Sequence, residues 1–468
     1  MQITSEQFKA AASRKLADPK LQKALNSAKG RLVVARARSI LEIDNFEEIR
    51  QVAADIRDHC LSYLDVYLEE WERKAQAAGA VVHWAESYED VNRIVLEIAR
   101  KADVKKVIKS KSMLGEETGL NEYLEQGGLE VKETDLGEYI IQQAGDYPSH
   151  IIAPAVHKSK DEIADLFAEK HKRPRLDDIA ALTHEAREIL RPHFFDADMG
   201  ITGANFLIAE TGSTMIVTNE GNGRMSTTMP RVHVAMASIE KCLPTLEDFS
   251  LIMRLLARSA TGQSISNYLS FTTGPKRAGD QDGPDEFHVI IVDVGRTRVL
   301  ASELREALRC IRCGACMNHC PVYQNIGGHA YGWVYPGPIG SVLTPSYVGI
   351  EKAIDLPNAA TLCNQCGVVC PVKIPLPDLM RKLREKQVEL KLRPAAERAG
   401  LNIWTWIAAR PWLYSPLTRI GARIGKLLGG KSRLLHWLPP GASQWTHGRD
   451  LPAPRGKTFR EIYAARKR

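Results

Sequence analysis

Cys310-Ile311-Arg312-Cys313-Gly314-Ala315-Cys316-Met317-Asn318-His319-Cys320-Pro321 is the stretch that decides the architecture of this chain. A second stretch is Cys363-Asn364-Gln365-Cys366-Gly367-Val368-Val369-Cys370-Pro371, and 42 residues lie between Cys320 and Cys363. Together they hold seven of the nine cysteines in a chain of 468 residues, and both end in Cys-Pro. Three thiolates spaced i, i+3 and i+6 allow one tight loop to reach three corners of a metal–sulfur cube. The spacing therefore predicts iron–sulfur clusters.

The ligands of each cluster follow from the C-x2-C-x2-C-x3-C-P spacing, which is that of two-cluster bacterial ferredoxins. In those proteins the fourth cysteine of a run binds the other cluster. On this pattern cluster 1 is held by Cys310, Cys313, Cys316 and Cys370, and cluster 2 by Cys320, Cys363 and Cys366. Cluster 2 then has three thiolates, and we place its missing cysteine at Val369. We expect [4Fe-4S] for cluster 1. For cluster 2 two forms stay open: [3Fe-4S], or [4Fe-4S] with a non-cysteine fourth ligand.

Zinc and disulfides explain these cysteines less well. Zinc sites favour four ligands in paired C-x2-C knuckles. Disulfide frameworks are typical of small secreted domains, whereas this chain opens with no apolar run that resembles a signal peptide. It also contains no stretch of about eighteen uncharged apolar residues, the length that would span a membrane. We therefore expect a protein of the reducing cytoplasm.

Composition and patterning divide the chain into three zones. Hydrophobic residues at 44% and charged residues at 25% are ordinary globular values. We predict an α/β domain over 1–298, a cluster domain over 299–394 and a basic C-terminal region over 395–468.

In the first zone, apolar residues recur at helical spacing from Ile49 to Trp71, which predicts one long helix with Cys60 in the core. Helical patterns alternate with short apolar runs, and this alternation favours a largely parallel sheet covered by helices. The predicted strands are 80–82, 104–108, 151–153, 204–209, 214–218 and 288–294, and the other predicted helices are 88–100 and 161–169.

The cluster zone opens with a predicted short helix from Ser302 to Arg309 and ends with a predicted helix after Pro377. The 42 residues between the motifs exceed what a minimal ferredoxin accommodates. The zone therefore looks like the α-helical type of ferredoxin, in which helices carry the two motifs.

The C-terminal region combines cations with tryptophans. From Gly400 to Arg468 there are thirteen Lys and Arg residues against two acids, Asp450 and Glu461, and five of the eight tryptophans lie there. Such a segment suits docking onto an acidic partner subunit or contact with an anionic membrane surface. Nucleic acid is the weakest alternative, because no nucleic-acid-binding pattern accompanies the charge.

Beyond the cluster spacing, the chain resembles the lactate utilization protein B family over nearly its whole length. The resemblance rests on the cysteine runs with Val372-Lys373-Ile374-Pro375-Leu376, on Ser110-Lys111-Ser112-Met113, and on Gly200 to Ala204 leading into Glu210-Thr211-Gly212-Ser213. It implies that the first zone is a lactate-utilization domain, related in fold to phosphosugar isomerases and CoA-transferases. It also implies a role in oxidising L-lactate to pyruvate beside a second Fe–S protein and a small protein that has only the first type of domain.

Two residues outside the clusters are weak catalytic candidates. Lys111 follows a predicted strand, and the loop after a parallel strand is where such sheets bind ligands. Its ammonium group suits a carboxylate, although a solvated surface lysine is the simpler interpretation. Glu210, in the predicted turn between two strands, is a candidate base or simply a turn residue. The histidines at 150, 157, 233 and 288 are expected to be structural.

We predict an electron-transfer subunit of an L-lactate-oxidising complex in the cytoplasm, with contact to the inner face of the membrane through its tail as an option. Two rivals stay open. One is an independent Fe–S enzyme that acts on a small carboxylate. The other is a redox sensor or assembly protein.

Overall fold

The computed structural model describes residues 3–466 except 219, 267, 440–441 and 447–448. Residues 1–387 and 388–468 form two compact units, and each is described by itself. The predicted zone boundaries near 298 and 394 remain predictions.

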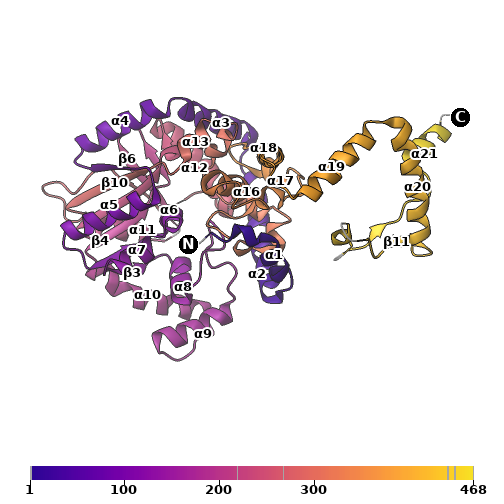
Figure 1. Cartoon of the computed structure of the whole chain (residues 1–468). Coiled ribbons are helices and arrows are strands. Elements are labelled where there is room, and N and C mark those ends of the chain that lie inside the picture. The colour runs from indigo at the N-terminus through magenta and orange to yellow at the C-terminus, as the bar shows by residue number, and fades with distance from the viewer. Residues whose placement is uncertain (1–2, 219, 267, 440–441, 447–448, 467–468) are drawn as a thin grey trace. The chain divides into compact units, whose positions relative to one another are not determined.

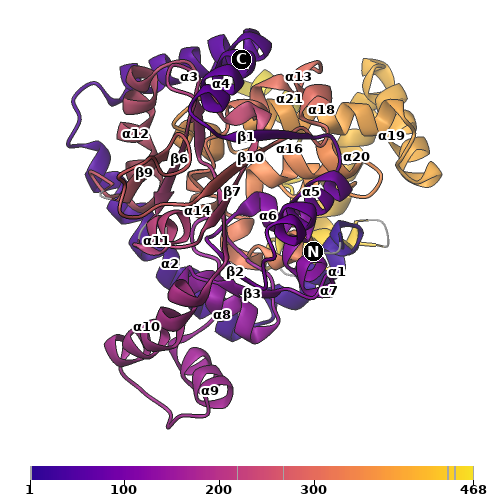
Figure 2. The same ribbon diagram turned by 90° about the vertical axis from the view of Figure 1, so that its left-hand side faces the viewer.

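A six-stranded parallel sheet is the framework of the first unit, with the strand order β1-β10-β7-β4-β2-β3 (Figure 2). Its strands are β1 (Val81–Ala85), β2 (Lys106–Lys109), β3 (Glu130–Glu133), β4 (Met199–Gly203), β7 (Val232–Ser238) and β10 (Glu286–Val292). The alternation of helical and apolar patterns in the sequence is thus confirmed as a parallel α/β arrangement.

Helices cover both faces of this sheet (Figure 1). One face packs against α5 (Tyr88–Lys101), α6 (Met113–Thr118) and α7 (Leu120–Gln126), and the other packs in part against α8 (Leu136–Ala144), α9 (Lys160–His171) and α10 (Ile179–Asp196). Neighbouring residues of one strand point to opposite faces. Val107 accordingly joins the core of the first face and Ile108 that of the second.

A smaller four-stranded sheet has the order β8-β5-β6-β9. The antiparallel pair β5 (Phe206–Ile208) and β6 (Ser213–Thr218) confirms the predicted hairpin, and β8 (Cys242–Leu243) and β9 (Tyr268–Thr272) complete the sheet. The hairpin turn is held by Trp71, whose indole N–H donates to the Ser213 carbonyl at 3.0 Å. Helices α11 (Asn222–Thr228) and α12 (Leu246–Thr261) follow β6 and β8 in the chain.

Three predicted elements differ in the structure. The short helix predicted from Ser302 to Arg309 is instead the 3-10 turn η3 (Arg305–Arg309). The single helix expected from Ile49 to Trp71 is two helices, α3 (Phe46–Ser62) and α4 (Leu64–Ala77), because Tyr63 between them has φ −127° and ψ 34°. The strand expected at 151–153 is a loop. There the backbone amides of Ile152 and Ala153 donate to His150 Nδ1 at 3.0 and 3.1 Å, and this local turn replaces ladder hydrogen bonds.

The sequence reasoning missed the two central strands β4 and β7. All seven residues of β7 are buried, so the strand lacks the polar–apolar alternation that marks a half-exposed strand. The segment also contains a histidine and two alanines, which weakened the apolar signal.

The cluster region is helical and, apart from the last two residues of α18, lies within the first unit. Its elements are the 3-10 turns η3 (Arg305–Arg309), η4 (His329–Tyr331) and η5 (Leu356–Asn358), with α13 (Arg296–Leu300), α14 (Ala315–Asn318), α15 (Tyr323–Ile326), α16 (Gly337–Val348), α17 (Gln365–Val369) and α18 (Leu376–Glu389). The N-terminal helices α1 (Phe8–Leu16) and α2 (Pro19–Ile40) pack against this region. Ser5, in the 3-10 turn before α1, and Gln22 of α2 donate to the carbonyls of Tyr331 and Asn325 at 2.8 and 2.6 Å.

The second unit contains α19 (Ala395–Ala408), α20 (Pro411–Gly429), α21 (Phe459–Arg466) and a two-stranded ribbon of β11 (Leu434–Leu435) and β12 (Leu451–Pro452). Large apolar side chains are exposed on these helices, among them Trp404, Trp412 and Leu427. Among the described residues, every helix is too short or too polar to cross a membrane.

Candidate iron–sulfur sites and an adjoining cavity

Four cysteines meet at one cavity, which we call the four-cysteine cavity. Cys310, Cys313 and Cys316 reach it from the first motif and Cys370 from the second. Cys313, Cys316 and Cys370 are buried, and Cys310 is half-buried. The backbone amides of Arg312 and Ile374 lie 3.4 Å from the sulfurs of Cys310 and Cys370, as donors to them.

Local backbone conformation folds the first motif around this cavity. Arg312 and Gly314 have φ of +59° and +73°, so the chain curls between successive cysteines. At Gly314 a glycine suits the turn, because a Cβ there would lie 3.2 Å from the ring of His150. Helix α14 begins directly after this turn and carries Cys316.

Two buried arginines hold the backbone of the second motif. Arg36 of α2 donates to the carbonyl of Val369 at 2.9 Å. Arg50 of α3 donates to the carbonyl of Cys370 through Nε at 3.0 Å and Nη2 at 2.6 Å. Both cations therefore lie beside the four-cysteine cavity, and the cysteine spacing gave no sign of either.

The remaining three motif cysteines line a second cavity, the three-cysteine cavity. Cys320 comes from the first motif, and Cys363 and Cys366 come from the second. Cys363 is exposed, so this cavity is the more open to solvent of the two sites.

The position of the missing cysteine needs correction. The described residues that line the three-cysteine cavity include Ala360, and Val369 is not among them. The spacing of the two motifs gives the reason. Cys310, the first cysteine of the first motif, precedes its last cysteine Cys320 by ten residues, and Ala360 precedes Cys370 of the second motif by the same number. Ala360, and not Val369, stands where a complete motif has its first cysteine.

The chemistry of these donors fits iron–sulfur clusters. All nine cysteines lie within the described residues and all are free. Burial raises the pKa of Cys366 to about 12 and that of Cys316 well above its usual range. Deprotonating several thiols at once in such places requires a strong positive charge, which a metal centre supplies. Cys60 and Cys242 are buried away from both cavities, as expected for Cys60.

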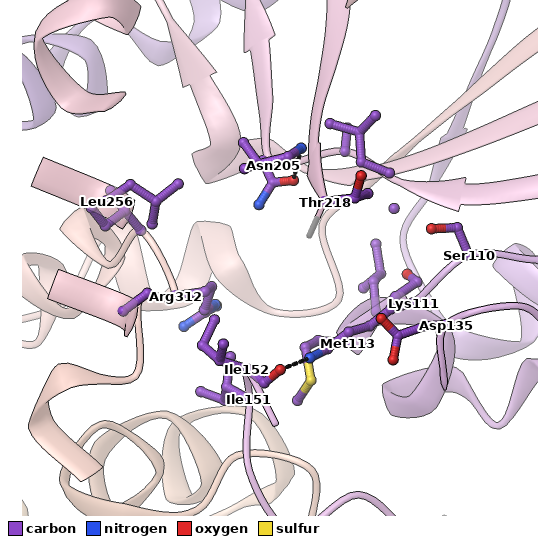
Figure 3. Close-up of a pocket in the computed structure, with 18 of the residues that line it drawn as sticks. Ser110, Lys111, Met113, Asp135, Ile151, Ile152, Asn205, Thr218, Leu256 and Arg312 are labelled. Atoms are coloured by element: carbon purple, nitrogen blue, oxygen red, sulfur yellow. Dashed lines mark hydrogen bonds between the residues drawn. The ribbon is translucent and has the colours of Figure 1, made fainter. Parts of the chain in front are cut away.

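A third cavity, of about 180 Å³, lies at the carboxyl ends of β2, β4 and β7, and we call it the basic cavity. Figure 3 shows Asn205 and Thr218 on one side of it, Ile151 and Ile152 opposite with the amino group of Lys111 directed at the Ile152 carbonyl, and Arg312 and Asp135 at its two remaining sides. Ligands of parallel α/β sheets bind at this edge.

The two weak catalytic candidates are not brought together. Lys111 lines the basic cavity, and its Nζ donates to the Ile152 carbonyl at 2.7 Å. Glu210 is exposed and accepts from the backbone amide of Leu246 at 2.8 Å, at the start of α12. Lys241, which sequence reasoning missed, lines the basic cavity instead.

A buried ionic network lies beside the basic cavity and includes Arg312, which lines it. Arg312 contacts Glu240 at 3.1 Å, Arg296 contacts the same carboxylate at 3.4 Å, and Arg296 contacts Glu117 at 2.8 Å. Burial alone would raise the pKa of Glu240, but Arg296 and Arg312 lower it to about 2. The carboxylate is therefore charged, and the charges of the four residues cancel.

The predicted structural histidines have local partners. His150 Nε2 lies 2.9 Å from Asn318 Oδ1 of α14, and His233 lies 2.9 Å from Thr202. His157 meets Asp146 and His329 within metal-binding distance, but Lys158 also pairs with Asp146 at 2.9 Å. That cluster is therefore balanced by protein charges already.

Three family models match consecutive parts of the chain: "LUD domain" at 68–292, "4Fe-4S dicluster domain" at 306–374 and "Lactate utilisation protein B, C-terminal" at 381–468. A protein named "Lactate utilization protein B" from Shouchella clausii is 42% identical, over 100% of this chain and 98% of that protein. The chain belongs to the lactate utilization protein B family.

One further relative matches this chain over nearly its whole length, and a solved structure matches about half of it. The "Uncharacterized electron transport protein YkgF" of Escherichia coli K12 is 42% identical, over 99% of this chain and 97% of that protein. A solved structure of a DUF162 family protein from Deinococcus radiodurans covers 49% of this chain and 98% of its own at 14% identity. Its TM-score is 0.27.

Proposed function

We propose that this chain is the iron–sulfur electron-transfer subunit of a three-protein system that oxidises L-lactate to pyruvate. The observation that carries the proposal is the gathering of seven cysteines into two neighbouring cavities, in a chain that matches lactate utilization protein B from end to end. Bound clusters would supply one-electron transfer at potentials that the surrounding protein sets.

In this proposal Cys310, Cys313, Cys316 and Cys370 hold a [4Fe-4S] cluster. Cys320, Cys363 and Cys366 hold the second cluster, a [4Fe-4S] centre with a non-cysteine fourth ligand, and [3Fe-4S] is the alternative. Arg36 and Arg50 hold the second motif in place, and the amides of Arg312 and Ile374 point at two of the sulfurs. The helical cluster region supports an α-helical ferredoxin fold, and the parallel sheet is compatible with the phosphosugar isomerase and CoA-transferase group.

The partners belong to the same proposal: a second Fe–S protein and a small protein with a lactate-utilization domain. The C-terminal unit is the proposed docking element, because it exposes Trp404, Trp412 and Leu427 on a strongly basic segment. Contact with the inner face of the cytoplasmic membrane is the alternative use of the same surface. Flotation with anionic vesicles, compared with co-purification with the two partners, separates these two uses.

Anaerobic EPR on the reconstituted protein, mixed with its two presumed partners, tests the function. L-lactate should produce the reduced-cluster signal only when the partners are present, and dithionite should produce it in every sample. Reduction by dithionite but never by L-lactate would overturn the proposal and favour a redox sensor. Reduction by L-lactate without partners would favour an independent enzyme.

A further inference from the structure

The basic cavity contains buried polar atoms that have no partner. Among the described residues, Ser110 Oγ, Asn222 Oδ1 and Arg312 Nη1 are buried without a hydrogen bond, and all three side chains line this cavity. Ser110 is 1% exposed, Asn222 4% and Arg312 8%. Buried polar groups are almost always paired in native proteins. Three such groups on one cavity therefore indicate that a polar ligand completes it.

The charge of the cavity specifies an anion. In the described part of the chain its charged lining residues are Lys111, Lys241, Arg312 and Asp135. The charge of Arg312 is balanced within the ionic network of Glu240, Arg296 and Glu117. The remaining charged groups of the lining are two lysines, Lys111 and Lys241, and one carboxylate, Asp135. Among the described residues, none accepts a hydrogen bond from Lys241 Nζ, although Lys241 is 8% exposed. Glu240 and Cys310 are close enough to favour the charged form of Lys241, but burial outweighs them. A negative charge on a ligand would give this largely buried cation the direct ion pair that it lacks among the described residues.

The pKa of Lys241 is lowered by its surroundings. Burial, followed by the nearby Arg312 guanidinium, lowers the pKa of Lys241 to about 7. A negative charge beside an ammonium group favours its protonated form. An anionic ligand would therefore keep Lys241 charged at neutral pH and gain an ion pair with it.

The size and apolar walls of the cavity specify a small organic ligand. Its volume of about 180 Å³ is below the range of roughly 300–1,000 Å³ that drug-sized ligands occupy. Met113, Ile152, Ile216 and Leu256 supply apolar surface beside the polar groups. A bare inorganic anion would leave this apolar surface unused, whereas a carboxylate with a short carbon chain would contact it.

The cavity adjoins the four-cysteine cavity. Ile151, Ile311 and Arg312 line both. Arg312 connects them directly, because its backbone amide donates to Cys310 Sγ at 3.4 Å while its guanidinium lines the basic cavity. A ligand in the basic cavity would thus lie one layer of side chains away from cluster 1.

We propose that the basic cavity binds a small 2-hydroxy- or 2-oxomonocarboxylate, so that the substrate or product of the reaction docks in this chain. The carboxylate pairs with Lys241 and Arg312, and the 2-oxygen reaches Ser110 or Asn222. This inference rests on the proposed function for the identity of the ligand, but the partnerless polar atoms and the surplus cation stand without it.

Anaerobic calorimetry on the reconstituted full-length chain, without partners, measures this binding directly. L-lactate and pyruvate should both bind. Propionate, which lacks the 2-oxygen, should bind at least about tenfold more weakly, because the buried polar atoms stay unpaired. Inorganic phosphate tests for an adventitious ion only. Equal affinity for propionate and L-lactate, or binding of phosphate alone, would overturn the proposal.

Lys241→Gln locates the site, since it removes the surplus cation but keeps a polar side chain of similar length. Its affinity for L-lactate should fall roughly tenfold or more, and Lys101→Gln, at an exposed helix end, should leave the affinity unchanged. Ser110→Ala is a second variant, with a smaller expected loss, in case Lys241→Gln fails to fold. Unchanged affinity in both cavity variants would contradict the assignment.

Pyruvate should also lower the reduction potential of cluster 1, which adjoins the basic cavity. The negative charge of the bound carboxylate makes it less favourable to add an electron to that cluster. A potentiometric EPR titration with and without pyruvate measures this shift. If this chain binds no carboxylate but L-lactate reduces the clusters through the partners, the present inference fails and the proposed function stands. If the chain binds L-lactate but the complex is never reduced by it, the proposed function fails and the binding site stands.

Discussion

The four-cysteine and three-cysteine cavities are built from the same two motifs, yet their surroundings differ. Three buried cysteines, the half-buried Cys310 and the cations Arg36 and Arg50 surround the first. The second has Cys363 exposed and Ala360 where the motif repeat has a cysteine. The first site is thus enclosed and lined by four cysteines, and the second is more open and lined by three.

This difference suggests a division of labour. Exclusion of solvent and fixed hydrogen-bond donors around a cluster keep its reduction potential at a defined value. Exposure and an incomplete ligand set suit contact with another molecule. If electrons enter beside the basic cavity, the open site is the natural exit toward a partner.

Breaking the enclosed site should have the largest effect. Cys313→Ser removes a ligand from the four-cysteine cavity, so the reconstituted protein should lose about four iron atoms per chain and the part of its stability that depends on metal binding. Iron analysis and thermal unfolding under anaerobic conditions measure both. Cys60→Ser is the control, because Cys60 is buried elsewhere and donates to the Cys242 carbonyl at 3.0 Å. Equal iron loss in both variants would mean that the cavity does not hold a cluster.

Completing the open site should have a smaller and opposite effect. Ala360→Cys adds a thiolate on the wall of the three-cysteine cavity, so iron loss to a chelator from this site should slow by roughly tenfold. Its EPR spectrum should also change to that of a fully thiolate-bound cluster. Val369→Cys is the matched control and should leave both unchanged, since Val369 lies outside the described lining of this cavity. The reverse result, protection by Val369→Cys alone, would make Val369 the position of the missing ligand after all.

The two sites also show how far sequence reasoning reaches. Cysteine spacing is local and chemically specific, so the grouping into four and three cysteines follows from the spacing alone, and the structure brings together these same groups. Val369 lies three residues after Cys366, whereas the repeat of the first motif has its missing cysteine three residues before Cys363, at Ala360.

What spacing could not reveal comes from distant parts of the chain. Arg36 and Arg50 lie about three hundred residues before the carbonyls that they hold. Lys241 reaches the basic cavity only because β7 is a central strand, and β7 escaped prediction because its burial on both faces removes periodicity. Lys111 was found because a strand and its following loop are adjacent in sequence.

Removing the positive charge of Arg50 beside the enclosed site should have the smallest effect on stability and reduction potential. Arg50 donates twice to the Cys370 carbonyl, whereas the Cys320 carbonyl accepts from the neutral backbone amide of Gln324 at 2.9 Å. Arg50→Met should therefore cost about 1.5–3 kcal/mol of unfolding free energy, the range for a hydrogen bond to a charged group. It should also lower the reduction potential of the enclosed cluster, because a nearby cation favours the more negative reduced state.

Arg50→Lys separates these two consequences, since it keeps the charge but cannot reproduce the planar pair of donors. In Arg50→Lys the reduction potential of the enclosed cluster should stay close to that of the unmodified protein. The free energy of unfolding should fall, but by less than in Arg50→Met. Potentiometric EPR resolves the two clusters, and the signal of the open site should not move in either variant. A shift of both clusters, or of the open one alone, would mean that the two sites are not electrostatically distinct and that their asymmetry is confined to ligand number.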